Sequence, residues 1–290
     1  MKAIHLAASG SIFPSRTPTI GSSQDRRSKE VKPVAVSPLK EQCKALKLAH
    51  VPLVYLDIDY HDREQYLHEV FAAELQARQA GKIRRLIRRA GFPAHKTLEE
   101  FDWYPVTLPA STTRSELADL VFIQRHENVL ALGAVGTGKT HLAVALGIKA
   151  CVEGKSVCFY RCLDMVNTLL EAHRQGRLAR LMDELSKLDL IIIDELGFVP
   201  LHRNGAELLF NIVARAYEQQ SVIVTSNLQF GEWNTVMGDN RLTAALIDRL
   251  VHHAHILAFE GESYRLQQAL SSAGAKPPDM VGPGKAAIAN

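Results

Sequence analysis

Residues 133–140 have the sequence Gly-Ala-Val-Gly-Thr-Gly-Lys-Thr, and this stretch decides the fold of the chain. It fits the pattern G-x-x-x-x-G-K-[ST], in which glycines allow a tight turn and bring backbone N–H groups close to phosphate oxygens. An apolar stretch at 128–132 precedes it and a helix-forming stretch at 140–152 follows it, as the pattern requires. The sequence therefore predicts a strand, a phosphate-binding loop and a helix in succession.

The residues of this loop have distinct expected roles. Lys139 is expected to reach the β- and γ-phosphates of a nucleotide, and Thr140 to ligate Mg²⁺ through its hydroxyl. The N-terminus of the following helix adds partial positive charge. A glycine-rich turn that binds nothing is the alternative, and the flanking strand and helix argue against it. The predicted nucleotide ligands are Gly133, Gly136, Thr137, Gly138, Lys139 and Thr140, together with Asp194 farther along the chain.

Two carboxylates follow the most apolar strand of the chain. Residues 188–193 have the sequence Leu-Asp-Leu-Ile-Ile-Ile, and Asp194 and Glu195 come next. In a parallel sheet the carboxyl ends of the strands face the ligand crevice, so both acids are expected at the phosphates. We expect Asp194 to hold Mg²⁺ and Glu195 to polarise the attacking water. An adjacent Asp-Glu pair is common, but this placement indicates nucleotide hydrolysis.

A polar residue also follows the next expected strand. That strand is Val-Ile-Val-Thr at 222–225, and Asn227 lies two residues beyond it. By the same sheet argument its amide reaches the site, where it is expected to orient the water and contact the γ-phosphate. The alternative is a turn residue that caps the strand.

Strands and helices alternate throughout this part of the chain, which predicts an α/β fold with a parallel sheet and helices on both faces. The expected strands are 128–132, 156–160, 188–193, 221–225 and 256–259, and the expected helices are 140–152, 163–174, 205–219 and 243–253.

Composition limits the remaining possibilities. A chain of 290 residues suggests about two domains. Hydrophobic residues make up 47% and charged residues 22%, which excludes a collagen-like or wholly disordered protein. No apolar run approaches the ~20 residues of a membrane span. The four cysteines form no C-x-x-C pair, so reduced thiols and a cytoplasmic protein without a membrane partner are expected.

The ends of the chain differ from its middle. Residues 1–38 hold four prolines and no apolar periodicity, and we predict a disordered leader there. Residues 271–290 are predicted to form a similar tail. Between them, we expect a small helical N-terminal domain at 39–100 and a nucleotide-hydrolysing domain at 101–270.

Charge is divided within the helical region. From Asp57 to Glu74 there are six acidic residues and one basic residue, and the stretch 78–96 holds seven basic residues and no acidic one. Helical spacing places four of the basic residues on one face: Arg78, Lys82, Arg85 and Arg89. A solvated helix face would explain this stripe, and so would contacts with nucleic-acid phosphates. The absence of interleaved acids favours DNA slightly.

The motifs at Gly133–Thr140, Asp194-Glu195 and Asn227, in this order, resemble the core of AAA+ ATPases. More narrowly, the chain resembles the IstB family of insertion-sequence helper ATPases and the related DnaC family of helicase loaders. The resemblance covers about 40–268 and rests on these segments: Thr97–Asp102, Gly138–Ala143, Asp194–Gly197, Thr225–Asn227, Gly231–Trp233, Leu246–Leu250 and Gly261–Leu266. The runs at Phe230–Trp233 and Asp248–His253 look closer to the transposon helpers.

The resemblance implies an oligomer that assembles with ATP and Mg²⁺, binds and bends duplex DNA, and recruits a partner transposase. It also implies that the domain at 39–100 contacts DNA or the partner. In this family pattern ATP lies at subunit interfaces, and Arg249 stands where the neighbour's arginine finger is expected; Arg241 is the second choice. An ion pair on its own helix is the alternative for Arg249. A DnaC-like helicase loader is the alternative function, and an ATP-binding switch without useful turnover is a third that Glu195 disfavours.

His252, His253 and His255 form one further cluster. A metal site would need well-placed ligands, and histidines at a helix end that are satisfied by their neighbours are far more usual. The sequence favours the second explanation.

Overall fold

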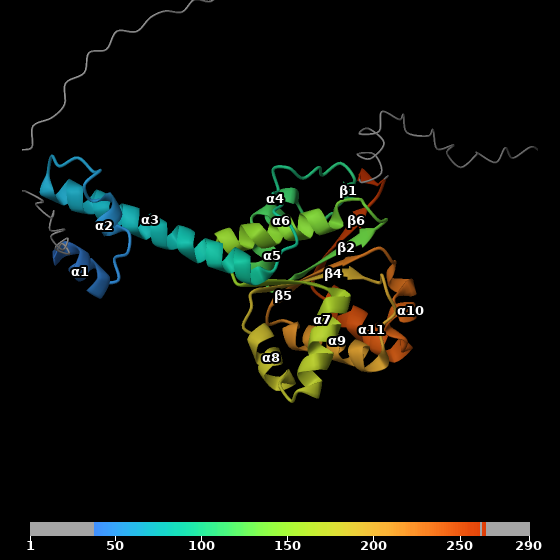
Figure 1. The fold of residues 1–290 in the computed structure, drawn as a ribbon. Coiled ribbons are helices and arrows are strands. Elements are labelled where there is room, and N and C mark those ends of the chain that lie inside the picture. The colour runs from blue at the N-terminus through green and yellow to red at the C-terminus, as the bar shows by residue number, and fades with distance from the viewer. Residues whose placement is uncertain (1–37, 262, 265–290) are drawn as a thin grey trace, which may run out of the picture.

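A six-stranded sheet forms the centre of the computed structural model, which describes residues 38–261, 263 and 264 (Figure 1). The strand order is β1-β6-β2-β5-β4-β3, and only the β1–β6 pair is antiparallel. The strands are β1 (Val106–Thr107), β2 (Asn128–Gly133), β3 (Val157–Arg161), β4 (Leu190–Leu196), β5 (Ser221–Ser226) and β6 (Ala254–Phe259). The predicted parallel sheet is therefore confirmed.

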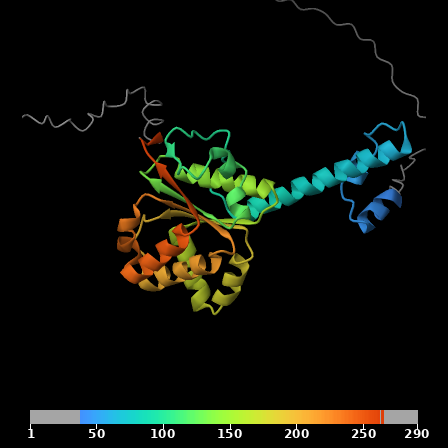
Figure 2. The same cartoon turned by 180° about the vertical axis from the view of Figure 1, so that it is seen from behind.

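Helices cover both faces of this sheet, as Figures 1 and 2 show from opposite sides. One face carries the end of α3 (Arg63–Ala90) with α4 (Arg114–Ala118), α5 (Val121–Gln124) and α6 (Lys139–Val152). The other face carries α7 (Cys162–Arg174), α8 (Leu178–Leu185), α9 (Arg203–Ala216), α10 (Asn234–Met237) and α11 (Asn240–Val251). A short 3-10 turn, η1 (Phe230–Glu232), precedes α10.

The run of isoleucines in β4 follows from this layering. Leu190 and Ile192 pack into the core under α6, whereas Ile191 and Ile193 pack into the core on the side of α7 and α9. Successive side chains of a strand point to opposite faces, so a strand covered on both sides must be apolar throughout. Such burial explains why the sequence of β4 lacks the alternation of a half-exposed strand.

The N-terminal helices form a small unit that projects from the core. It consists of α1 (Pro38–Ala45), α2 (Val51–Val54) and the first half of α3, which pack around Cys43, Val51 and Val70. The Asp62 carboxylate caps α3 by accepting hydrogen bonds from two backbone amides, and Gly91 ends the helix in the left-handed conformation. The far end of α3 packs on the α/β core through Leu86, Ile87 and Ala90. The two regions thus share one helix.

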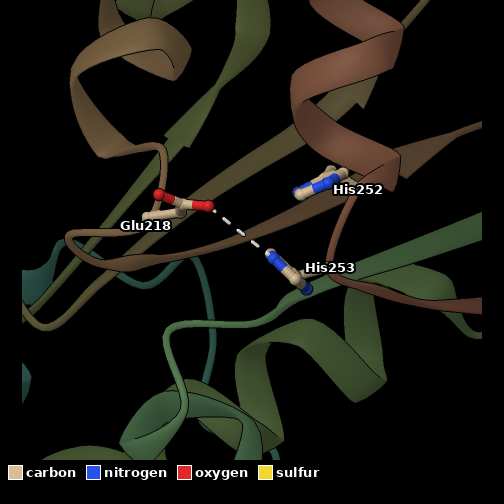
Figure 3. Close-up of side chains that lie close together, drawn as sticks. All are labelled: Glu218, His252 and His253. Carbon is tan, nitrogen blue, oxygen red and sulfur yellow. Dashed lines mark ion pairs between the residues drawn. The ribbon is translucent and has the colours of Figure 1, made fainter.

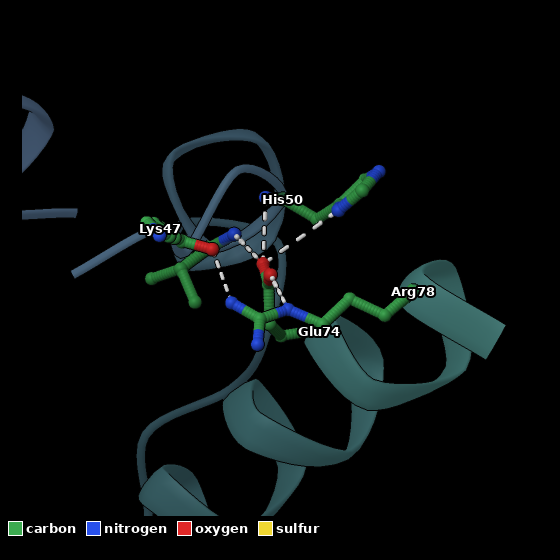
Figure 4. A network of polar contacts seen from close by, with 5 residues as sticks. Lys47, His50, Glu74 and Arg78 are labelled. Atoms are coloured by element: carbon green, nitrogen blue, oxygen red, sulfur yellow. Dashed lines mark hydrogen bonds and ion pairs between the residues drawn. The ribbon is translucent and has the colours of Figure 1, made fainter. Parts of the chain in front are cut away.

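Glu74 joins the parts of this unit (Figure 4). Its buried carboxylate accepts hydrogen bonds from the His50 amide at 2.7 Å, the Val51 amide at 3.1 Å and Arg78 Nε at 2.7 Å. Arg78 also donates to the carbonyl of Lys47. Burial raises the pKa of Glu74, but the hydrogen bonds outweigh this effect and the pKa is lowered overall. The network fixes the α1–α2 turn on α3.

The sequence also led to expectations about the cysteines, membrane-spanning helices and the two ends of the chain. All four cysteines are buried thiols, and burial raises the pKa of Cys158 and Cys162 to about 12. No helix within the described residues is both long and apolar enough to cross a bilayer. The predicted leader, apart from Pro38 at the start of α1, and the predicted tail lie outside the described residues.

Candidate functional site

The predicted site residues meet at the carboxyl edge of the sheet. The glycine-rich loop follows β2, Asp194 and Glu195 lie near the end of β4, and Asn227 follows β5. Because β5 lies between β2 and β4, these three strand ends are neighbours. The structure thus brings together the residues that the sequence places 94 positions apart, from Gly133 to Asn227.

Glycine is required in the loop for steric reasons. Gly133 has φ +143°, and a Cβ there would lie 2.0 Å from the carbonyl oxygen of Phe259. Gly136 has φ +83°, and its Cβ would lie 2.1 Å from Ser263 Oγ. Both the backbone conformation and the close neighbours exclude a larger residue.

Lys139 begins α6 and is buried within the loop. Its ammonium donates hydrogen bonds to the carbonyls of Gly133 at 2.8 Å and Ala134 at 2.5 Å. Thr137 Oγ1 lies 3.4 Å from the same nitrogen. A buried cation is thus held beside the N-terminus of a helix, where backbone N–H groups also favour negative charge. This is an arrangement that attracts an anion.

Asp194 joins three segments of the site. Its Oδ1 accepts hydrogen bonds from Thr140 Oγ1 at 2.8 Å and from Thr225 Oγ1 at 2.6 Å, and the residue is only 2% exposed. Thr140 and Asp194 therefore present two oxygens close together beside the loop. Mg²⁺ prefers oxygen ligands from one or two protein groups together with phosphate oxygens, so this pair fits that ion.

Glu195 has an unusual backbone. Its φ is +60°, in the left-handed region that non-glycine residues seldom adopt, and β4 shifts register against β5 between Ile193 and Leu196. The amide of Glu195 donates to Thr225 Oγ1 at 3.0 Å, and its carboxylate lies 3.7 Å from Arg161 Nε. Strained backbone of this kind concentrates at functional sites. Glu195 stays within β4 at this irregularity, and its side chain is 37% exposed.

Asn227 carries an unsatisfied polar atom. Its Oδ1 is buried and has no hydrogen-bond partner among the described residues. A buried acceptor without a partner is costly, and each such group calls for an explanation. A ligand or water molecule at the strand ends would supply the missing donor, which agrees with the predicted role of Asn227 and disfavours a simple strand cap.

A cavity of about 530 Å³ opens beside the loop. Its size suits a nucleotide-sized ligand. Its wall contains Phe101, whose ring meets that of His141 edge-on at 5.3 Å, and Tyr264, which donates to Asp102 and whose amide donates to the Gly136 carbonyl. The lining residues are Pro93, Ala94, Lys96, Glu100, Phe101, Asp102, Gly136, Thr137, Gly138, Lys139, Thr140, His141, Val144 and Tyr264. A larger cavity of about 650 Å³ between α7 and α8 contains no loop residue.

The structure assigns positions to residues that the sequence reasoning left without a role. Thr225 bridges Asp194 and Glu195, Arg161 pairs with Glu195, and Phe101, His141 and Tyr264 line the cavity. Thr225 and Arg161 are both at strand ends, so the topological argument that identified Asn227 could have found them. The cavity wall combines residues of 93–102 and 136–144 with Tyr264, which are far apart in the chain, and no local sequence pattern predicts it.

Arg249 lies away from the loop of its own chain. It is on α11, on the opposite face of the sheet from α6, where its guanidinium sits 4.7 Å from the ring of Phe210 and donates to the Ala245 carbonyl. Among the described residues no carboxylate pairs with it, in contrast to the alternative considered above. Arg241 is exposed at the start of the same helix.

The predicted DNA-binding stripe lies on α3, a single helix as the spacing requires. Its members differ in their surroundings. Arg78 is paired with Glu74, and Lys82 Nζ lies 3.3 Å from where Gly154 would carry a Cβ, at the end of α6. Arg85 and Arg89 are exposed, without a carboxylate partner in the described part of the chain. Arg84 and Arg88, which the stripe omitted, are exposed beside them.

Comparison with known proteins gives consistent matches. Residues 57–272 match the family model described as IstB-like ATP binding protein. A protein of Geobacillus stearothermophilus is named as an ATP-binding protein of insertion sequence IS5376. It is 40% identical over 204 residues, which cover 70% of this chain and 81% of that protein. A Pseudomonas aeruginosa protein is named as an ATP-binding protein of insertion sequence IS21. It is 40% identical over 205 residues, which cover 70% of this chain and 77% of that protein.

Solved structures show more distant likeness. The DnaC helicase loader is 19% identical, with a TM-score of 0.43 over 61% of this chain and 99% of that chain. The replication initiator DnaA, bound to AMPPCP and single-stranded DNA, is 20% identical, with a TM-score of 0.47 over 65% of this chain and 58% of that chain.

Proposed function

The chain belongs to the IstB-like ATP-binding protein family, and we propose that it is an ATP-hydrolysing, DNA-binding helper of DNA transposition. The proposal has three parts: ATP is bound and hydrolysed at the carboxyl edge of the sheet, the ATP-bound oligomer grips duplex DNA, and the assembly recruits a transposase. The names of the relatives assign those proteins to insertion sequences, which supports the third part over a helicase loader.

ATP binding follows from the loop and the cavity. The triphosphate would lie along Gly133–Thr140, where Lys139 exchanges its carbonyl partners for β- and γ-phosphate oxygens. The base would enter the cavity walled by Phe101, His141 and Tyr264. Thr140 and Asp194 would hold Mg²⁺, which when bound neutralises charge on the phosphates.

Hydrolysis is assigned to Glu195 and its neighbours. The observation that supports it most directly is the pair of hydrogen bonds that Asp194 accepts from Thr140 and Thr225. Glu195 follows Asp194 in the chain, and its amide donates to the same Thr225 hydroxyl, which places Glu195 beside the proposed Mg²⁺ ligand. In the proposed step water attacks the γ-phosphorus, the bond to the ADP oxygen breaks, and Glu195 takes a proton from the water. Asn227 Oδ1, which has no hydrogen-bond donor among the residues that the structure describes, would orient that water.

DNA contact is assigned to the exposed basic residues of α3. Arg85 and Arg89 would neutralise phosphates of the duplex, with Arg84 and Arg88 beside them. We assign smaller parts to Lys82 and Arg78, since these side chains already have neighbours within the chain. Arg249 would complete the ATP site of an adjacent subunit, which ties turnover to assembly.

Phosphate release, measured with and without duplex DNA, tests the enzymatic part. We expect DNA-stimulated turnover in the wild type and none in Lys139→Ala. Lys187→Ala, which removes an exposed lysine between α8 and β4, should keep wild-type turnover. Equal turnover with and without duplex DNA would contradict a link between ATP hydrolysis and DNA binding. Co-purification with a transposase would support the transposition role, whereas a stable complex with a replicative helicase would indicate a loader.

A further inference from the structure

Three side chains outside the nucleotide site converge where α9 and α11 end (Figure 3). Glu218 follows α9, and His252 and His253 follow α11. One ligand atom from each residue lies within 4.8 Å of those of the other two. All three side chains are exposed, so they can rotate closer together without moving buried backbone.

The donor set is that of a transition-metal site. Two imidazoles and one carboxylate are the protein ligands of many zinc sites that keep a fourth position open. Hard cations such as Mg²⁺ prefer oxygen ligands, and so do not match two histidines. His253 Nε2 lies 3.7 Å from Glu218 Oε1, close to the roughly 3.3 Å that separates two ligands of a tetrahedral zinc ion.

Two local features concern His252 and Glu218. The Tyr217 hydroxyl lies 2.9 Å from Nδ1 of His252, and metal-bound histidines usually have such a hydrogen bond on their second nitrogen. Glu218 has φ +56°, a backbone conformation that glycine adopts more readily. Glycine at this position would relieve the backbone but remove the carboxylate.

A simple ion pair between Glu218 and His253 accounts for less of the geometry. An exposed pair of this kind contributes little to stability, and it does not include His252, whose ring lies 4.2 Å from that of His253. His255 behaves differently. Its two ring nitrogens lie 2.6 Å from Thr112 Oγ1 and 2.9 Å from Glu127 Oε2. Neighbouring residues also contact His252 and His253, as the sequence predicts, but only His255 has a partner for each ring nitrogen in these contacts.

We propose that Glu218, His252 and His253 bind one divalent transition-metal ion of the zinc class, which ties the end of α9 to the end of α11. These helices already contact each other where Arg249 lies over Phe210. A bound ion would hold the helix that carries Arg249 in a fixed position on α9. The site does not depend on the proposed function, because none of its ligands takes part in ATP binding.

Metal titration of the full-length, nucleotide-free protein tests this inference. Mg²⁺ is kept in excess so that the Thr140–Asp194 oxygens do not compete for the probe. Co²⁺ is followed by its visible absorption, and Zn²⁺ by equilibrium dialysis. We expect one equivalent of either ion, with the intense visible bands of a tetrahedral Co²⁺ centre and thermal stabilisation by Zn²⁺.

Variants decide between this site and scattered weak binding. His253→Ala and Glu218→Gln should each weaken Zn²⁺ binding by at least about tenfold. His173→Ala, which removes an exposed histidine on α7, should leave it unchanged. Circular dichroism of each variant checks the fold. Equal affinity and stoichiometry in His173→Ala, His253→Ala and Glu218→Gln would overturn the proposal.

Discussion

The guanidinium of Arg161 lies 3.7 Å from the carboxylate of Glu195, and this ion pair joins the ends of the neighbouring strands β3 and β4. Its two members are 58% and 37% exposed, so the pair is weak enough to break when a ligand arrives. Until it breaks, the pair keeps the Glu195 carboxylate beside Arg161, at the place where we assign the attacking water.

Glu195→Gln is expected to lower turnover by about 10²–10⁴-fold while leaving ATP affinity within a few-fold of the wild type. The amide keeps the size of the side chain but cannot take a proton. Phosphate release and binding of a fluorescent ATP analogue measure the two effects. Glu184→Gln, an exposed change on α8, is the matched control. Wild-type turnover in Glu195→Gln would show that another residue activates the water.

Arg161→Ala is expected to raise turnover without DNA, since Glu195 would be released from its ion pair. The expected change is a few-fold, because an exposed pair is worth about 0.2–1 kcal/mol. Steady-state phosphate release at low and high salt measures it. If turnover instead falls together with that of Glu195→Gln, Arg161 contacts the nucleotide directly.

Arg249 can be tested by mixing subunits. Arg249→Ala and Glu195→Gln should each be inactive alone. In an equimolar mixed oligomer, about a quarter of the interfaces would combine an intact Glu195 with an intact Arg249 from the neighbour, so turnover should partly return. If Arg249 acted within its own chain, mixing would restore nothing.

The basic residues of α3 should differ in their effect on duplex binding. Arg85→Ala and Arg89→Ala should each weaken binding for all sequences and reduce the salt dependence by about one unit of log–log slope. Arg180→Ala on α8, far from this surface, should have no effect. Fluorescence anisotropy across a salt series provides the slopes. Unchanged slopes in both α3 variants would make this a merely solvated face.

Glu74→Ala should loosen the N-terminal unit. The His50 and Val51 amides would lose their acceptor, at a cost of about 2 kcal/mol, which corresponds to roughly 30-fold faster hydrogen exchange at these amides. Glu69→Ala, an exposed change on the same helix, is the control. The same rate in both variants would mean that the apolar contacts alone hold the unit together.

The lowered pKa of Glu74 also predicts a pH dependence. A carboxylate whose folded pKa lies below its unfolded value stabilises the fold above the unfolded pKa, about 4.3, and this contribution is lost as pH falls through the folded pKa. Protection of the His50 and Val51 amides should therefore decline below about pH 4.3 in the wild type. Glu74→Gln should remove that decline, and a decline of equal size in the variant would contradict this assignment.

Much of the fold could be predicted because the central strands β2, β4 and β5 are buried on both faces and the crossover helices have apolar sides. The expected helix 140–152 is α6 with one added residue, and the strand before Asp194 continues through Glu195 to Leu196. By contrast, β1 has only two residues, and α8 follows α7 after a short turn, so neither has a pattern long enough to be recognised.

The positions of Lys139, Asp194 and Asn227 at one edge of the sheet could be predicted from the strands that they follow. The Arg161–Glu195 pair and the cavity wall depend on tertiary contacts between distant segments, which residue spacing does not encode. For the same reason the α3 stripe looked uniform in sequence, although Arg78 is bound to Glu74. Helical spacing predicts on which face of a helix a residue lies, but it does not predict which side chains of neighbouring elements contact it.

ATP-dependent binding of duplex DNA tests the central claim most directly. Anisotropy is measured for duplex and single-stranded probes at one fixed salt concentration, with and without ATP, for the wild type and Lys139→Ala. Tight duplex binding that requires ATP and disappears in Lys139→Ala is the predicted result. Binding to single strands alone, or duplex binding that is equal with and without ATP in both proteins, would contradict the account.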